Sequence, residues 1–258
     1  MQTLKSVTIR FKFCKTGVFK YLSHLDILTV ISRAVSRSGV RVKFSSGFNA
    51  KPKILLSNPI PLGVESNAEY GDIELLEDTG AGEFKDLMNK NLPQMMQISD
   101  AIKIDGKIPG IMSQIDLVCY EFEIGFKKDK NGTNRKKLPH NKNSPESSGI
   151  KFKTISEEQE TILSALFDAK SGHCSSSGTI HRYEVLTLAN NIFLLKIFGY
   201  AKILNGENRS VFKFNDFFRW LSEAAETHGF AILSSRKTEV YVMRQGRILT
   251  PLEAAFQV

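Results

Sequence analysis

The sequence predicts an α+β protein made of two tandem ferredoxin-like modules with antiparallel sheets. Residues 1–110 and residues 111–258 show the same order of strand and helix patterns, β-α-β-β-α-β, which is the order of the split βαβ arrangement. A chain of 258 residues is long enough for two domains of ordinary size. Its 41% hydrophobic and 24% charged residues are typical of a globular protein.

The first module begins with a strand and a well-delimited helix. Residues 7–13 alternate apolar and polar side chains, which indicates a strand with one buried face. Ser23 and Asp26 have the spacing of a capping box, and Gly39 is placed to end the helix that they open. The remaining elements are expected to be strands at 42–57 and 68–76, a helix stopped by Pro93, and a strand at 95–104.

The second module repeats this order around an insertion. A strong alternation at 118–126 indicates its first strand. Residues 127–150 hold few large apolar side chains, so we expect a flexible basic insertion there. It is either an arm that engages RNA or a partner, or a tolerated loop. The later elements are expected to be a helix capped by Ser156 and Gln159, strands at 181–190 and 192–203 joined at Asn190-Asn191, a helix capped by Asn215 and ended by Gly229, and a strand at 230–243.

The sheet face turned away from the helices of the first module is expected to be open. Arg10 and Lys12 alternate with the apolar residues of the first strand, and Asp72 occupies a matching position on the third. We expect exposed cross-strand ion pairs there, each contributing about 0–1 kcal/mol. Such a face lacks the aromatic platforms of an RNA-recognition motif.

Positive charge is unevenly distributed along the chain. The formal net charge is +8, and residues 1–53 hold eleven Lys or Arg but one acid, Asp26. Residues 54–110 hold four Lys and ten Asp or Glu. A separated distribution of this kind can focus an electric field on a polyanion. The alternative is a solvated surface without an anionic partner.

Several classes of protein are disfavoured by composition. Cys14, Cys119 and Cys174 are too far apart for a zinc site or for the cysteine triplet of an iron–sulfur cluster. No run of about 20 apolar residues could cross a bilayer, and the N-terminus lacks the apolar core of a signal peptide. We therefore expect a cytoplasmic protein with no membrane segment, no metal and no cofactor of its own.

Three clusters resemble the radical-SAM-associated (radical-SAM-linked) family of bacterial proteins. They are YLSHLD at Tyr21–Asp26, SSGFNAKPK at Ser45–Lys53 and PLGVESNAEYGDIEL at Pro61–Leu75. That family is a domain of unknown function, fused to or separate from cobalamin-binding radical SAM enzymes, and the resemblance is good over about the first 105 residues. It implies a radical SAM partner but no reaction. Lys51 stands where the family pattern has a histidine. The motif residues are Ser23, His24, Asp26, Gly47, Phe48, Asn49, Glu65, Ser66 and Glu69.

Basic residues on and after the first helix are the candidate anion-binding set. Basic side chains around a glycine-containing loop suit phosphate contacts, and the alternative is solvated charge partly paired with the acidic residues at 65–78. His24 is a weak candidate for a general acid or base; the alternative is a histidine that hydrogen-bonds locally at the start of the helix. The anion-binding candidates are Arg33, Arg37, Arg41, Lys43, Lys51 and Lys53.

These observations favour an accessory protein that is not itself an enzyme. It would bind or present an RNA, or another phosphate-bearing substrate, to a radical SAM partner. One alternative is a metal-independent RNA endonuclease that uses His24, which rests on fold-level analogy. Another is a purely structural docking partner of the radical SAM enzyme.

Overall fold

The computed structural model describes residues 6–46, 48–104, 106, 108–126, 161–163, 165–166, 180–189, 191–202 and 211–256. These residues form a mixed α+β fold. Its strands are β1 (Val7–Lys15), β2 (Ile54–Leu56), β3 (Glu65–Leu75), β4 (Ile98–Ile104), β5 (Leu117–Phe126), β6 (Ile180–Ala189), β7 (Ile192–Tyr200), β8 (Phe230–Arg244) and β9 (Arg247–Leu249). Its helices include α1 (His24–Ser38), α2 (Ala81–Asn89), α3 (Ile111–Gln114), α5 (Phe214–His228) and α6 (Pro251–Ala254), with 3-10 turns η1 (Gly17–Tyr21) and η2 (Gln94–Met96).

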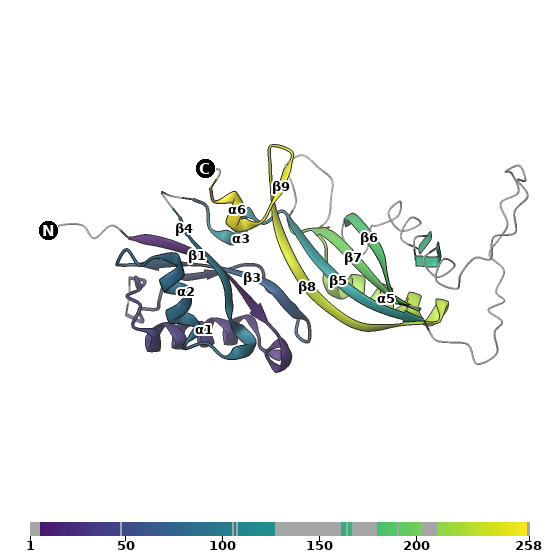
Figure 1. The fold of residues 1–258 in the computed structure, drawn as a ribbon, viewed down its shortest axis with the longest axis horizontal. Helices are drawn as coiled ribbons and strands as arrows, with labels where there is room; N and C mark the ends of the chain where they lie inside the picture. Colours follow the sequence, from purple (N-terminus) through teal and green to yellow (C-terminus); the bar gives the residue numbers. More distant parts are fainter. Residues whose placement is uncertain are drawn as a thin grey trace, which may run out of the picture.

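The strands form one open and mostly antiparallel sheet. Its main order is β4-β1-β3-β8-β5-β7-β6, with β2 paired to β3 and β9 paired to β8. The two halves of the chain meet where β3 and β8 lie side by side in the middle of the molecule (Figure 1). This contact is short and parallel, and it pairs Glu65 with Arg236 and Ser66 with Lys237. We call this region the junction.

Helices α1 and α2 cover one face of the sheet in the first half (Figure 1). The capping box predicted for Ser23 and Asp26 is confirmed, and Gly39 ends α1 with a left-handed backbone, φ 76°, which glycine adopts without steric strain. Side chains at helical spacing, such as Ile27 and Ile31, then pack on the strand residues of the first core.

The second half has its own core, which is rich in phenylalanine. Phe217 of α5 packs against Phe122 of β5, with ring centroids 5.3 Å apart. Trp220 joins the same core, 5.5 Å from Phe217. The predicted cap at Asn215 is wrong, because α5 starts at Phe214 and its N-cap, Lys213, makes no side-chain cap.

The expectation of an open sheet face is also wrong. Helices α3 and α6 lie over the junction on the side away from α1 and α2 (Figure 1). They form a third core in which Ile111, Ile115 and Leu252 pack with Tyr70 and Val240. Neither helix was anticipated, because each is only four residues long and so too short to show a helical period.

Other boundaries differ from the expected ones in ways that follow from local geometry. Only Ile54–Leu56 of the strand expected at 42–57 is continuous, because Val42 and Phe44 make isolated bridges instead. The strand expected at 95–104 starts at Ile98, after η2. The insertion at 127–150, Ser156 and Asn190 lie outside the described residues. In the part of the chain that is described, none of the helices has the length and apolar character to cross a membrane.

Candidate functional site

The first motif cluster acts mainly as a helix start. The Ser23 hydroxyl donates to the Asp26 carboxylate at 2.6 Å, the Ser23 backbone N–H donates to it at 3.0 Å, and the Asp26 N–H returns a bond to the Ser23 hydroxyl. The hydroxyl bond, followed by the backbone bond, holds the pKa of Asp26 below its ordinary value. His24 is half-buried, and within the described residues no hydrogen bond or ion pair links it to another side chain. It therefore lacks a described acid or base partner for proton transfer.

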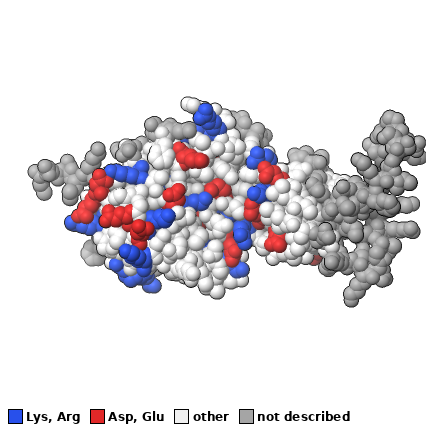
Figure 2. Space-filling model, viewed as in Figure 1, with Lys and Arg blue, Asp and Glu red and all other residues white. Residues whose placement is uncertain are grey.

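The candidate anion-binding residues separate into paired and unpaired groups. Arg41 lies 2.7 Å from Glu77, and Lys43 and Lys53 lie 2.8 and 3.5 Å from Glu74. The hydrogen bond from Lys43 is the main reason that the pKa of Glu74 is lowered. Basic and acidic side chains also lie next to each other over the face shown in Figure 2. Most of this charge is therefore already balanced locally.

Arg33, Arg37 and Lys51 make no ion pair within the described residues. Arg37 instead donates to the backbone carbonyl of Asn91 at 2.7 Å. Arg33 and Lys51 are exposed. They are the members of the predicted set that remain available to a ligand.

The second motif cluster lies in a basic hairpin, which we define as residues 43–53, with Gly47 outside the described residues. Its two arms are joined by backbone bonds from Lys53 N–H to the Lys43 carbonyl and from Ser45 N–H to the Lys51 carbonyl, each 2.8 Å. Between them Phe48 is fully exposed, and Phe44 has 52% of its surface exposed. Asn49 is exposed as well. The hairpin thus presents aromatic rings and an unpaired lysine to solvent.

The third motif cluster leads into the junction. Glu65 accepts a bond from Gly17 N–H at 3.0 Å and lies 3.9 Å from Arg236 of β8. Glu69 is buried against Lys237, with 2.5 Å between Lys237 Nζ and Glu69 Oε1. The motif residues Glu65, Ser66 and Glu69 therefore join the two halves.

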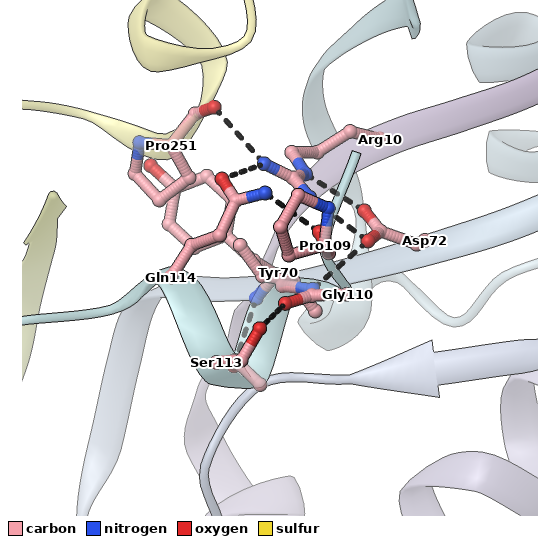
Figure 3. Close-up of polar contacts among 10 residues, drawn as sticks. Arg10, Tyr70, Asp72, Pro109, Gly110, Ser113, Gln114 and Pro251 are labelled. Carbon is pink, nitrogen blue, oxygen red and sulfur yellow. Dashed lines mark hydrogen bonds and ion pairs between the residues drawn. The ribbon is translucent and has the colours of Figure 1, made fainter. Parts of the chain in front are cut away.

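A buried polar network occupies the face that α3 and α6 cover (Figure 3). Arg10 is fully buried and makes a two-pronged contact with Asp72, at 2.7 and 2.9 Å. It also donates to Gln114 of α3 and to the backbone carbonyl of Pro251 of α6. Asp72 accepts a third bond from the Ile111 N–H at 3.0 Å. The network fastens both covering helices to the sheet.

A second network crosses the junction on the same face. The Tyr70 hydroxyl donates to Glu239 of β8 at 2.7 Å, and Lys12 pairs with the other oxygen of that carboxylate at 2.5 Å. Burial, followed by the negative charge of Glu239, raises the pKa of Tyr70. Tyr70 therefore stays protonated as a donor. The geometry can hold the halves in register, but it brings no nucleophile and base together.

Lys15 is the buried cation of the junction whose charge is least balanced by neighbouring groups. It is 1% exposed, and no hydrogen bond or ion pair from its side chain is found in the described ranges. Burial, with a smaller contribution from Lys237, lowers its pKa, while the negative charge of Glu69 opposes the shift.

Lys15, Lys237 and Glu239 were missed from the sequence, whereas Lys12 was expected in an exposed pair within the first module and instead pairs with Glu239 of β8. Register shifts conceal the missed positions: one lies between Phe13 and Lys15 on β1, and another leaves Thr238 of β8 without a register partner. Simple alternation therefore assigns Lys237 to the same face as Glu239, whereas Lys237 contacts Glu69 and Glu239 contacts Tyr70.

The described residues include no group of three or more His, Cys, Asp or Glu that could hold a metal ion. Cys119 is buried, and burial is the largest of the causes that raise its pKa to about 11, so little of its thiol is ionised near neutral pH. Cys14 contacts the Met95 carbonyl. Neither of these cysteines has the surroundings of an activated nucleophile.

Comparison with known proteins gives a family but no activity. No curated protein matches the chain. A crystal structure of an unknown protein from Galdieria sulphuraria aligns with 90% of this chain and 99% of that chain, at 15% identity and a TM-score of 0.25; a similarity of this size does not establish a shared fold. The profile of DUF2344, described as an uncharacterized protein conserved in bacteria, matches residues 8–186. Because this match spans most of its length, the chain belongs to the DUF2344 family.

Proposed function

We propose that this protein is a non-catalytic accessory protein that binds single-stranded RNA through the basic hairpin and presents it to a radical SAM partner. The observation that carries the proposal is the full exposure of Phe48, with half-exposed Phe44 on the same hairpin. Aromatic rings beside cations form the usual platform for unpaired bases, because every base has a face that can stack. Lys51, exposed and without an acidic partner in the described ranges, supplies a phosphate contact.

Phe48→Ala tests the stacking part of the proposal. Fluorescence anisotropy with labelled single-stranded fragments of tRNA should show weaker binding by about 1–3 kcal/mol per lost base contact. Phe256→Ala is the matched control, because Phe256 is an exposed phenylalanine that is not part of the hairpin. Equal affinity of the two variants would remove the hairpin from the proposal.

Lys51→Ala tests the phosphate contact. For single strands, log affinity falls with log salt by about 0.7 for each phosphate neutralised, so this variant should have a slope smaller by about that amount. Lys90→Ala, at the exposed C-terminal end of α2, is the control and should keep the original slope. Affinity that does not respond to salt would exclude RNA as the ligand.

The same experiments address the nuclease alternative. The half-buried His24, which lacks a described acid or base partner, favours binding without cleavage. Labelled RNA should stay intact during a prolonged incubation with the protein. Cleavage that His24→Ala abolishes would replace the binding proposal with the endonuclease.

A separate surface supports docking to the radical SAM partner. Large apolar side chains of η1, α1, η2 and the loop before β3 are exposed by 41–71%. Their segments touch: the Gly63 N–H donates to the Lys20 carbonyl at 2.9 Å, and the Thr16 N–H donates to the Met95 carbonyl at 3.0 Å. Exposed apolar clusters of this kind are typical of protein-binding surfaces. The cluster, which we call the apolar end, consists of Val18, Tyr21, Leu25, Leu62 and Met95.

The apolar end can be tested apart from RNA binding. Leu25→Ser and Leu62→Ser should prevent copurification of the radical SAM protein from native lysate and leave RNA affinity unchanged. Leu55→Ser, at an exposed position of β2, is the control for loss of surface apolarity. Copurification that survives both changes at the apolar end would place the docking surface elsewhere.

We further propose that each half is a ferredoxin-like module, and that the sheets of the two modules are joined at the junction. The support is the strand order, which is β4-β1-β3-β2 in the first half and β8-β5-β7-β6 in the second, with antiparallel pairing within each. Leu163, in a stretch only partly described, is buried in the second core where a module helix belongs. An experimental structure with a helix around Leu163 packed on β5 and β7 would complete the second module.

A further inference from the structure

One positive charge at the junction is left without a negative partner. Arg10 pairs with Asp72, Lys12 with Glu239, Arg236 with Glu65 and Lys237 with Glu69. Lys15 is 1% exposed and has no such partner within the described residues. Burying an ammonium group without a counter-charge is unfavourable, and the described residues of the junction supply one negative charge too few to balance it.

Lys15 also lies in a row of donors that crosses three strands. It is the register partner of Ser66 on β3, and Ser66 is the register partner of Lys237 on β8. Lys15, Ser66 and Lys237 are all at most 3% exposed. The register shift in β8 places Lys237 opposite Tyr120, and residues directly opposite each other in an antiparallel pair share a face. The row therefore runs from the first core toward the second.

The row has more donors than acceptors. Each lysine carries three N–H donors and no acceptor, and a serine hydroxyl carries one donor. Glu69 is the nearby carboxylate: it contacts Lys237 directly and acts on Lys15 only through its charge. The Ser66 oxygen already accepts a bond from the Ala68 N–H at 3.1 Å, and no acceptor for its own proton is found in the described residues.

We propose that Lys15, Ser66 and Lys237 form a binding site for one oxyanionic group, a phosphate or a carboxylate, at the junction of the two halves. Such a group supplies the missing negative charge and accepts from the two lysines and the serine hydroxyl. Charge-assisted bonds of this type are the strong class of hydrogen bond. Because the ligand touches β1, β3 and β8, its binding also ties the two halves together. The site is distinct from the basic hairpin and does not depend on its role in RNA binding.

Arg236 and Glu65 mark the way into this site. Their contact is long, 3.9 Å, and the Arg236 side chain is 44% exposed. They are the register neighbours of Lys237 and Ser66. A weak pair at the edge of a buried charged row can separate and let an anion pass, with Arg236 attracting it from solvent.

Thermal unfolding of the full chain in sodium phosphate or sodium acetate, at ionic strength held constant with sodium chloride, tests the site. A ligand that binds the folded state raises the unfolding midpoint in a saturable way. We expect this rise with one of the two anions. Phosphate alone identifies a phosphate group as the ligand class, and acetate alone identifies a carboxylate. A wild-type midpoint that responds to neither anion overturns the proposal.

Lys15→Met, which replaces the ammonium group with an apolar chain of similar length, should abolish the response. Lys103→Met is the control, since Lys103 is a half-buried lysine of an ordinary surface pair with Asp78, and should keep it. A Lys15→Met protein that keeps the full response also overturns the proposal. If that variant does not fold, Ser66→Ala decides: it should weaken apparent affinity by about tenfold, the effect of losing one strong hydrogen bond, and unchanged affinity counts against the site.

Discussion

The positive charges of the first half lie in two regions that differ in burial. The buried charges stabilise the fold, whereas the exposed charges are available to bind a ligand. On β1, Arg10 is fully buried and held by Asp72, Gln114 and the Pro251 carbonyl. On the hairpin, Lys51 is exposed and has no acidic partner among the described residues. A buried cation must be matched by fixed partners because it has lost its water. An exposed cation keeps its water and remains free to bind.

The largest expected effect is at the buried pair of β1. Asp72→Ala leaves the Arg10 guanidinium buried beside Gln114 without its carboxylate, and we expect a loss of about 3–5 kcal/mol in the free energy of unfolding. Urea denaturation measures it. Glu77→Ala, which removes the partner of the exposed Arg41, should cost only about 0–1 kcal/mol.

The double variant Arg10→Met with Asp72→Leu sharpens this prediction. Because the apolar pair leaves no unmatched charge, its loss should be smaller than that of Asp72→Ala alone. A double variant at least as unstable as the single one would show that packing, rather than the unmatched charge, dominates. Equal losses for Asp72→Ala and Glu77→Ala would erase the distinction between the two regions.

The sequence predicts much of the first half and little of the junction. Strong local signals, such as the alternation in β1 and the Ser23–Asp26 capping box, lead to the observed strand and helix. The Arg10–Asp72 pair is also predictable from strand order, but its burial is not. Burial depends on α3 and α6, which come from distant parts of the chain.

Long-range geometry also explains what the sequence conceals at the candidate sites. Lys15 and Lys237 meet Ser66 only because of register shifts in β1 and β8 and a short parallel contact between the halves. No local pattern encodes such a contact. The pairing of Lys43 with Glu74 likewise depends on which segments lie next to each other in the folded chain. The exposed hairpin differs, since its glycine, aromatic and lysine residues are adjacent in the sequence.

An intermediate effect is expected at Tyr70, which joins the halves with one charge-assisted hydrogen bond. Tyr70→Phe leaves the half-buried Glu239 with Lys12 and the Val240 N–H as partners, and we expect a loss of about 1.5–3 kcal/mol at neutral pH. Tyr21→Phe, at an exposed tyrosine, is the control and should change stability little. Urea denaturation followed by the fluorescence of Trp220 reports both.

The pH dependence of the same variant has a defined sign. The pKa of Tyr70 is raised in the folded protein, so its contribution to stability is complete below the ordinary tyrosine value of about 10. It is lost as pH rises from there toward the folded pKa, because the unfolded state releases the proton first. Tyr70→Phe should therefore flatten part of the alkaline decline. An unchanged alkaline limb contradicts burial of this hydroxyl at the junction.

The smallest effect is expected at Asp26, an exposed carboxylate whose partners are the serine of the capping box rather than a cation. Its pKa is lowered in the folded state, so its contribution is present above the unfolded value of about 4 and is lost as pH falls through the folded one. Asp26→Asn should make the acid limb of the stability curve shallower and should leave Tyr70-dependent alkaline behaviour untouched. Asp86→Asn, on the exposed side of α2, is the control. If both variants change the acid limb equally, the effect is one of net charge, and the capping box is not what distinguishes Asp26 from other surface acids.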